Sequence, residues 1–198
     1  YMQPKDPTII EVGPAHYISI EGQSAPEGEA FQQSVGALYS LAFTMKMMQQ
    51  TQAKKNYSVN PLEGLWWADV KDTESFRQLP RDQWRFKLLM RVPKFITKEN
   101  LAQAIEACEG RNEKAPHERI KLETIEEGTC VQMLHVGPYS EEPANIDRMH
   151  DFAKAQGYVL DGKHHEIYLS NPQTTPPEKL KTILRQPIRK PQEKGIGQ

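Results

Sequence analysis

Apolar residues recur along the chain with two spacings, every second position and every third or fourth position. Residues 9–22 (IIEVGPAHYISIEG) alternate β-branched and aromatic residues with polar ones, which predicts an extended strand interrupted at Gly13-Pro14. From position 28 to about 50, apolar residues advance by three and four, the spacing of one helix face. They are Phe31, Val35, Leu38, Ala42 and Met45. The chain is therefore expected to begin with a strand and then a long helix.

Two strands and a second helix are expected next. Residues 57–70 and 83–92 are strand candidates joined by a charged loop that holds Pro80, which predicts a hairpin with a long tip. Thr97 is placed to cap a helix that runs to about residue 109, with Glu99 in its first turn. Its apolar face consists of Leu101, Ile105 and Cys108.

The second half begins after a polar segment, residues 110–117 (GRNEKAPH), which predicts a linker with a boundary near 112. Residues 120–125 and 129–136 are expected to be strands around a turn at 126–128, and residues 142–156 a helix stopped by Gly157. Residues 164–170 predict another strand. Thr175-Pro176 is expected to begin a last short helix that ends at Pro187, and residues 191–198 a disordered tail.

A strand, a glycine-bearing turn and a helix occur twice. HYISIEG precedes the helix at 28–50, and VQMLHVG precedes the helix at 142–156. We therefore predict an α+β chain of two repeats, 8–111 and 118–190, within a single domain that spans residues 1–190. Two such units packed about a pseudo-two-fold axis leave a central cleft, and clefts between repeated units commonly bind ligands.

The composition limits the classes of binding partner that we expect. Lys plus Arg (25) and Asp plus Glu (26) nearly cancel in the 198 residues, so nucleic acid is not expected as a partner. Cys108 and Cys130 are too few for a disulfide framework and favour reduced thiols in the cytoplasm. No segment approaches the roughly 20 apolar residues of a membrane span, so a membrane partner is not expected either. The oligomeric state is left open.

Polar and aromatic residues gather in two short strand candidates. In HHEIYL, pleating places His164, Glu166 and Tyr168 on one face, and from spacing alone Glu166 fits a solvent-exposed face as well as a pocket. In PLEGLWW, Glu63 shares a face with Trp67, whereas Trp66 points to the opposite face. Either tryptophan alone fits a core position equally well.

His135 and Tyr139 flank the Gly137-Pro138 turn at the end of a strand. The Tyr139 hydroxyl is suited to donate a hydrogen bond to a carbonyl that gains negative charge, and a tyrosine packed on the turn is the alternative. His135 is more typical of a structural histidine. The histidines and cysteines lack zinc-ligand spacing, so no metal is expected. The chain also lacks a phosphate-binding glycine loop and a G-x-S-x-G elbow.

Segments in both halves resemble the GyrI-like small-molecule-binding family. They are EAFQQSVGALYSLAF (29–43), PLEGLWW (61–67), HVGPYSEE (135–142) and HHEIYLSNP (164–172), and the resemblance extends over residues 8–190. It implies two strand-helix-strand-strand (SHS2-type) units with a central ligand cleft, in a stand-alone member. In the family's multidrug-binding regulators a buried glutamate faces cationic aromatic ligands, and the matching residue is Glu166.

The doubled tryptophan after PLEG resembles a branch of hydrolases that open cyclopropane-bearing, DNA-alkylating natural products. This resemblance implies a cofactor-free detoxifying hydrolase that acts on a small aromatic ligand. Its catalytic residues would be Glu166, Glu63 and Tyr139, and its ligand-binding residues Trp67, Tyr168, Trp66 and His135. The alternative is a non-catalytic binder or sensor of aromatic, often cationic, drugs. A third possibility, binding to a topoisomerase, is suggested only by the family's name.

Overall fold

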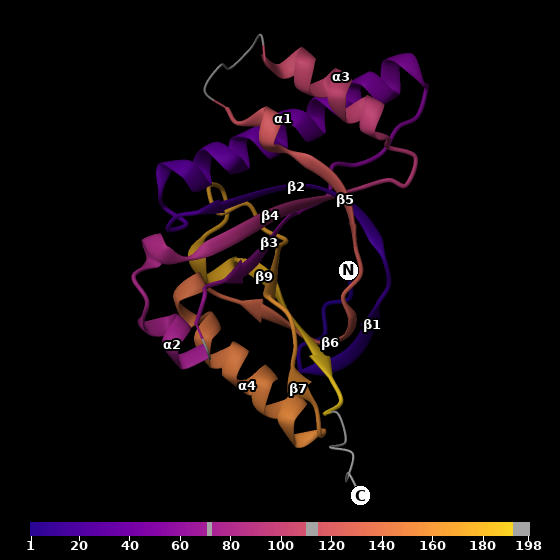
Figure 1. Cartoon of the computed structure of the whole chain (residues 1–198). Helices are drawn as coiled ribbons and strands as arrows, with labels where there is room; N and C mark the ends of the chain where they lie inside the picture. Colours follow the sequence, from indigo (N-terminus) through magenta and orange to yellow (C-terminus); the bar gives the residue numbers. More distant parts are fainter. Residues whose placement is uncertain (71–72, 110–114, 192–198) are drawn as a thin grey trace, which may run out of the picture. The chain divides into compact units, whose positions relative to one another are not determined.

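A computed structural model describes residues 1–70, 73–109 and 115–191 of the chain (Figure 1). The chain divides into two compact units. The N-terminal unit contains residues 14–126, and the C-terminal unit contains residues 1–13 together with the chain from 127 onward. The backbone therefore passes between the units twice, at 13–14 and at 126–127.

The N-terminal unit is an antiparallel sheet with two longer helices. Its elements are β2 (Ala15–Gln23), α1 (Glu29–Gln52), β3 (Leu62–Trp67), α2 (Thr73–Gln78), β4 (Arg85–Val92), α3 (Lys98–Glu109) and β5 (Lys121–Ile125), with 3₁₀ turns at Arg81–Gln83 and His117–Arg119. The strand order is β5-β2-β4-β3. Helix α1 packs against α3 and against strands β2 and β4 (Figure 1). Phe31 of α1 stacks on Trp66 and meets Phe86 edge-on, which fixes the helix on one face of the sheet.

The C-terminal unit is likewise built on antiparallel sheet, with one helix. Its elements are β1 (Thr8–Val12), β6 (Gly128–Val136), α4 (Glu142–Ala155), β7 (Val159–Leu160), β8 (His164–Tyr168) and β9 (Lys181–Arg189), with 3₁₀ turns at Tyr139–Glu141 and Pro177–Lys179. The strand order is β1-β6-β9-β8, and β7 pairs with the end of β9. Met149 and Ala153 of α4 pack on Val131, Met133 and Leu184, so α4 covers one face of this sheet.

The two units repeat one topology. β2-α1-β3-β4 and β6-α4-β8-β9 have the same order, and in both the third strand lies between the first and the second. The predicted α+β duplication of strand-helix-strand-strand units is therefore confirmed. One further strand pairs with the first strand of each repeat, β5 with β2 and β1 with β6.

Several local signals in the sequence act as predicted. The break at Gly13-Pro14 separates β1 from β2, and the Asn100 amide donates to the Thr97 hydroxyl at 3.3 Å, so Thr97 caps α3. Gly157 adopts a φ of 77°, a conformation that glycine enters without strain, directly after α4.

The helix predicted from Thr175 to Pro187 is wrong. Only a 3₁₀ turn forms there, and it is followed by strand β9. Leu180 and Leu184 have helical spacing, but residues 182–186 are all buried, on both faces, as in a strand flanked on both sides. The spacing of two leucines was too short a pattern to separate the two structures.

Two connections also differ from the prediction. The charged loop that holds Pro80 contains the short helix α2. The turn at 126–128 does not pair its flanking strands, because β5 pairs with β2 whereas β6 pairs with β1 and β9. As a result, residues 8–12 lie in the C-terminal unit and residues 121–125 in the N-terminal unit. The boundary near 112 and the tail from 192 lie outside the described residues.

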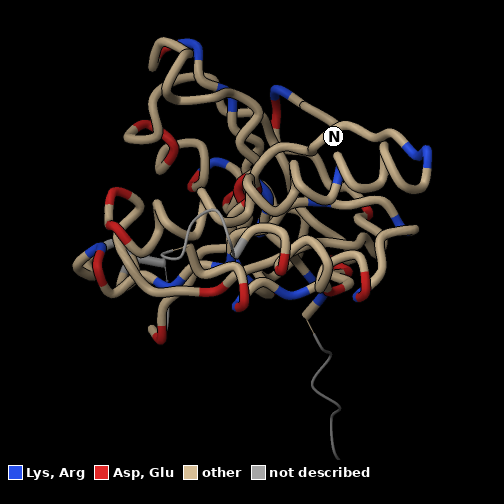
Figure 2. Tube along the Cα trace, turned by 90° about the horizontal axis from the view of Figure 1, so that it is seen from above, with Lys and Arg blue, Asp and Glu red and all other residues tan. Residues whose placement is uncertain are grey.

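The distribution of charged residues and the lengths of the apolar helices agree with what the composition predicts. Basic and acidic residues are interspersed along the trace (Figure 2), consistent with the formal net charge of −1. In the part of the chain that the structure describes, no helix is long and apolar enough to span a bilayer.

Candidate functional site

Strand β8 presents three polar side chains on one face. His164, Glu166 and Tyr168 alternate with the buried residues His165 and Ile167. The Tyr168 hydroxyl donates a hydrogen bond to Glu166 Oε2 at 2.7 Å, and His164 Nε2 lies 3.3 Å from Glu166 Oε1. The Glu166 side chain is only 15% exposed. The shared face follows from pleating, and the structure brings the three side chains into one cluster.

Helix α4 begins over this same face. Leu184 is the cross-strand partner of Glu166 and packs in the core cluster beneath α4, so Glu166 lies on the helix-covered side of the sheet. Glu142, the first residue of α4, is 5% exposed, and Pro143 follows it at a helix position that needs no backbone donor. Among the described residues, Glu142 Oε1 has no hydrogen-bond partner.

Glu142 and Glu166 form a carboxyl pair. Burial, together with the negative charge of Glu166, raises the pKa of Glu142 to about 9, and the nearby Thr182 hydroxyl offsets this rise only in part. Glu142 therefore holds a proton at neutral pH beside a second carboxyl group. A proton donor next to a proton acceptor is the arrangement that general acid–base chemistry needs.

Tyr139 supplies an aromatic ring at this cluster. It begins the 3₁₀ turn that leads into α4, and its exposed ring meets Tyr168 edge-to-face, with ring centroids 6.0 Å apart and planes at 82°. Tyr139, Tyr168 and the two carboxyl groups thus belong to one region of the C-terminal unit.

His135 holds the turn before α4. Its Nε2 donates to the Pro138 carbonyl at 3.1 Å, and its Nδ1 accepts from Asn145 Nδ2 at 2.8 Å. Both ring nitrogens are occupied, which matches the structural alternative considered for this residue. His135 therefore helps to position Tyr139 and the start of α4.

The other predicted site residues lie on β3, in the N-terminal unit. Glu63 is fully buried, and the half-buried Trp67 packs against the cluster of Leu65 and its neighbours on the face opposite α1. Trp66 lies on the α1 face, where its ring contacts Phe31, Trp84 and Phe86. Pleating separates the two indoles as expected. Within its repeat, Glu63 lies on the sheet face opposite α1, whereas Glu166 lies on the sheet face that α4 covers.

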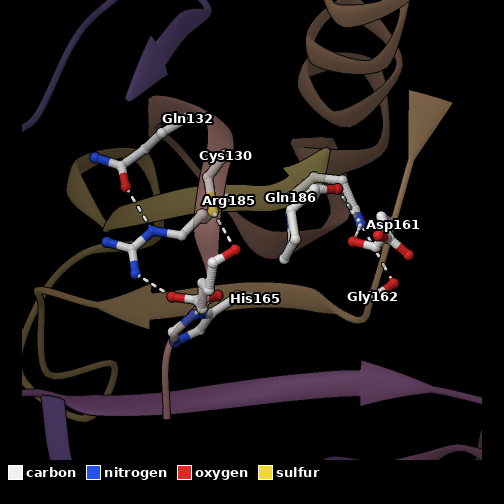
Figure 3. A network of polar contacts seen from close by, with 9 residues as sticks. Cys130, Gln132, Asp161, Gly162, His165, Arg185 and Gln186 are labelled. Carbon is white, nitrogen blue, oxygen red and sulfur yellow. Dashed lines mark hydrogen bonds and ion pairs between the residues drawn. The ribbon is translucent and has the colours of Figure 1, made fainter. Parts of the chain in front are cut away.

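A buried charged network lies on the opposite face of β8 and was missed from the sequence. Figure 3 shows the Arg185 guanidinium reaching Gln132 on one side and, on the other, the carboxylate that His165 also contacts. Arg185 donates to Gln132 Oε1 at 2.7 Å and to Glu127 Oε2 at 2.6 Å, and His165 Nδ1 lies 2.8 Å from Glu127 Oε1. Burial opposes ionisation of Glu127, but His165 and Arg185 outweigh it and hold its pKa below the ordinary value.

Glu142 was also missed from the sequence, although the spacing of residues along α4 indicated that it is buried. Glu142, Ile146, Met149 and Ala153 advance by four, three and four, so the acid continues the inward-facing stripe of α4. An acidic residue at a stripe position is the pattern of a buried carboxyl. Among the described residues, no group of three histidine, cysteine or acidic side chains is arranged to hold a metal ion.

Comparisons with known proteins identify the family of this chain. The family model of the GyrI-like small molecule binding domain matches residues 94–189. An uncharacterized conserved protein from Listeria innocua is 39% identical, with 96% of this chain and 95% of that chain covered and a TM-score of 0.87. The chain belongs to the GyrI-like small-molecule-binding family.

Two further solved structures are similar to this chain. A hydrolase from Listeria innocua is 37% identical, with 96% of this chain and 94% of that chain covered and a TM-score of 0.83. The C-terminal domain of EcmrR, at 13% identity, 94% and 98% coverage and a TM-score of 0.60, shares the fold alone. No curated protein matches the chain.

Proposed function

We propose that this GyrI-like protein is a hydrolase of electrophilic, planar small molecules and that Glu166 is its general base. The observation that carries the proposal is the carboxyl pair, in which Glu166 lies beside a second carboxyl that holds a proton. The similarity to a Listeria innocua hydrolase, at 37% identity over nearly the whole chain, supports hydrolysis.

The substrate class that fits best is a planar compound with a cyclopropane ring conjugated to a carbonyl, so the reaction would detoxify a DNA-alkylating agent. Such a ring is already activated by strain, so positioned proton transfer supplies the remaining help. Glu166, held by the Tyr168 hydroxyl, takes a proton from water as the water oxygen bonds to a ring carbon. The strained carbon–carbon bond breaks, and its electron pair moves toward the conjugated carbonyl.

Binding of the planar ligand is assigned to the aromatic residues. Tyr139 and Tyr168 form an edge-to-face pair beside Glu166 in the C-terminal unit. Trp67 presents a half-buried indole in the N-terminal unit and is assigned to ligand binding within its own unit. Stacking on such rings stabilises a flat ligand. Trp66 and His135 are not assigned to ligand binding. Trp66 packs against aromatic rings of the core, and both ring nitrogens of His135 make hydrogen bonds.

A non-catalytic binder of aromatic cations is the second candidate. A poorly exposed carboxylate beside two tyrosine rings offers charge pairing together with cation–π contact, which is the recognition that such cations need. This function requires Glu166 but no transferable proton.

The Glu166→Gln variant distinguishes the hydrolase from the non-catalytic binder. Purified protein is incubated with a cyclopropane-conjugated carbonyl compound, and the ring-opened, hydrated product is quantified by mass spectrometry. We expect the variant to bind the compound but to lose turnover at least a hundredfold, and the exposed Glu178→Gln control to behave as the wild type. Binding of the compound by the wild type without any product would overturn the hydrolase. A loss of affinity for a quaternary aromatic cation in Glu166→Gln would then favour the binder.

A further inference from the structure

We propose that Glu142 is the general acid of this site, which delivers its proton to the substrate oxygen that gains negative charge as the ring opens. This inference rests on the proposed hydrolase function and names the group that completes it. Neither the sequence nor the similarity to known proteins assigned a role to Glu142.

Three features of its surroundings support this role. Glu142 is 95% buried at the start of a 14-residue helix, and its Oε1 accepts and donates no hydrogen bond among the described residues. A buried carboxyl oxygen without a hydrogen-bond partner is unusual, because an unsatisfied polar atom costs free energy that a structural position would avoid. Glu166 is near enough for its charge to act on Glu142, and Thr182 lies beside the carboxyl.

Glu142 keeps its proton although it lies at the N-terminus of a helix. A helix N-terminus stabilises negative charge, so an acid in the first turn ordinarily ionises easily. At Glu142 burial and the charge of Glu166 outweigh that effect, and the pKa rises to about 9. The Glu142 carboxyl therefore stays protonated at neutral pH, where the proposed hydrolysis takes place.

The Tyr168 hydroxyl and the His164 imidazole are less suited to donate a proton. The Tyr168 hydroxyl already donates to Glu166, and the His164 ring lies against the opposite oxygen of the same carboxylate. Both of them therefore position the base. Glu142 is the group whose proton is not used by that arrangement.

The step balances in atoms and charge. The water oxygen bonds to the ring carbon, one carbon–carbon bond of the cyclopropane breaks, and its electron pair passes through the conjugated system to the carbonyl oxygen. Glu142 gives its proton to that oxygen, and Glu166 receives the proton that the water loses. The carboxyl pair carries one negative charge before and after the step, so no additional charge is buried. Proton exchange with solvent then returns the proton from Glu166 to Glu142.

The test is Glu142→Gln, with Glu141→Gln as the matched control on the neighbouring exposed position. Glutamine preserves the size of the side chain and an N–H donor but has no proton to transfer. We expect kcat to fall at least a hundredfold while KM changes little, and the fall of kcat above about pH 9 to disappear. Infrared difference spectra provide a readout besides activity. The wild type and Glu141→Gln should show a protonated carboxyl band at pH 7 that Glu142→Gln lacks.

The outcomes separate the two proposals. Turnover by the wild type that is preserved in Glu142→Gln with an unchanged pH profile overturns the acid role alone. A protonated carboxyl band that persists in Glu142→Gln overturns it as well, because the proton then resides elsewhere. A wild type that turns over no substrate overturns the proposed hydrolase and the acid role with it. A lower kcat in Glu142→Gln together with loss of the infrared band supports both.

Discussion

At the scale of single residues, the raised pKa of Glu142 also has a consequence for stability. In the unfolded chain this carboxyl ionises above its ordinary pKa of 4.5, whereas in the folded protein it keeps its proton to about pH 9. Between these values the folded state binds one more proton than the unfolded state. Raising the pH across this window therefore lowers the free energy of unfolding.

We expect Glu142→Gln to remove this penalty. The variant should match the wild type near pH 4.5 and become more stable as the pH rises, by at most about 3 kcal/mol at pH 7, because each pKa unit corresponds to about 1.4 kcal/mol. Urea unfolding at pH 4.5, 7 and 8.5 measures the difference. A difference of equal size at all three pH values would contradict the raised pKa.

The candidate site was predictable where it depends on local geometry. Pleating alone places His164, Glu166 and Tyr168 together and separates Trp66 from Trp67, because neighbouring side chains of a strand point to opposite faces. Glu142 was missed because its burial is created by β8 and β9, which come after α4 in the chain. A sequence pattern shows the helix stripe but does not show which strand will cover its first position.

At the scale of elements, strands β2 and β4 of the N-terminal unit meet at a close contact between Gly22 and Phe86. The two residues are cross-strand partners, and a Cβ built at Gly22 would lie 2.4 Å from Phe86 Cζ. The Phe86 ring is fully buried, with Phe31 and Trp66 beside it, so it has little room to move. We expect Gly22→Ala to lower the free energy of unfolding by about 1–3 kcal/mol, measured by urea unfolding.

Gly36→Ala is the control for this contact. Gly36 lies exposed in α1, and a Cβ there would meet no atom within 4 Å. Alanine restricts the unfolded chain and favours the helix, so this variant should gain about 0.5–1 kcal/mol. Destabilisation of the same size in both variants would show that the loss does not come from the Phe86 ring.

The buried network on the other face of β8 links several elements of the C-terminal unit. Arg185→Met leaves Glu127 buried with His165 as its remaining side-chain partner and should cost about 3–5 kcal/mol. In the Arg185→Met/Glu127→Gln double variant the uncompensated charge is absent, so the combined loss should be smaller than the sum of the single losses. Guanidinium unfolding of the four proteins gives this coupling energy, and additive losses would mean that Glu127 is not held by Arg185.

The elements show the same division between predictable and unpredictable features. Helix α1 was predicted because its apolar stripe is long, and α3 because Thr97 caps it. β9 was misassigned because its burial on both faces is produced by β6 and β8, which pair with it over long sequence separations. Hydrophobic periodicity identifies a strand only when one face is exposed and the other is buried. Residues 182–186 of β9 are buried on both faces, so the strand has no such periodicity.

At the scale of the whole molecule, the units exchange strands. β1 pairs with β6 of the C-terminal unit but runs directly into β2 of the N-terminal unit, and β5 pairs with β2 but runs directly into β6. Contiguity in sequence suggested repeats at 8–111 and 118–190, because a linear pattern assigns a strand to the helix that follows it. The exchange means that residues 1–12 contribute to a sheet whose other strands begin more than 100 residues later.

Deletion of residues 1–12 tests this assignment. The Leu134 amide donates to the Pro4 carbonyl at 2.7 Å, so amides on this side of β6 face β1 and the N-terminal segment. Because successive amides of a strand point in opposite directions, those facing the deleted segment are Cys130, Gln132 and Leu134. The amides facing β9 are Val131, Met133 and His135. Hydrogen exchange followed by NMR should show a loss of protection of roughly tenfold or more in the first set only.

The strands of the other unit provide the control for the deletion. If β1 belongs to the C-terminal sheet, the amides of β4 in the N-terminal unit keep their protection, because none of their ladder partners is removed. Equal loss of protection in both sets of β6 amides would indicate global unfolding. A loss confined to β4 would contradict the strand exchange, because it would place the deleted segment in the sheet of the N-terminal unit.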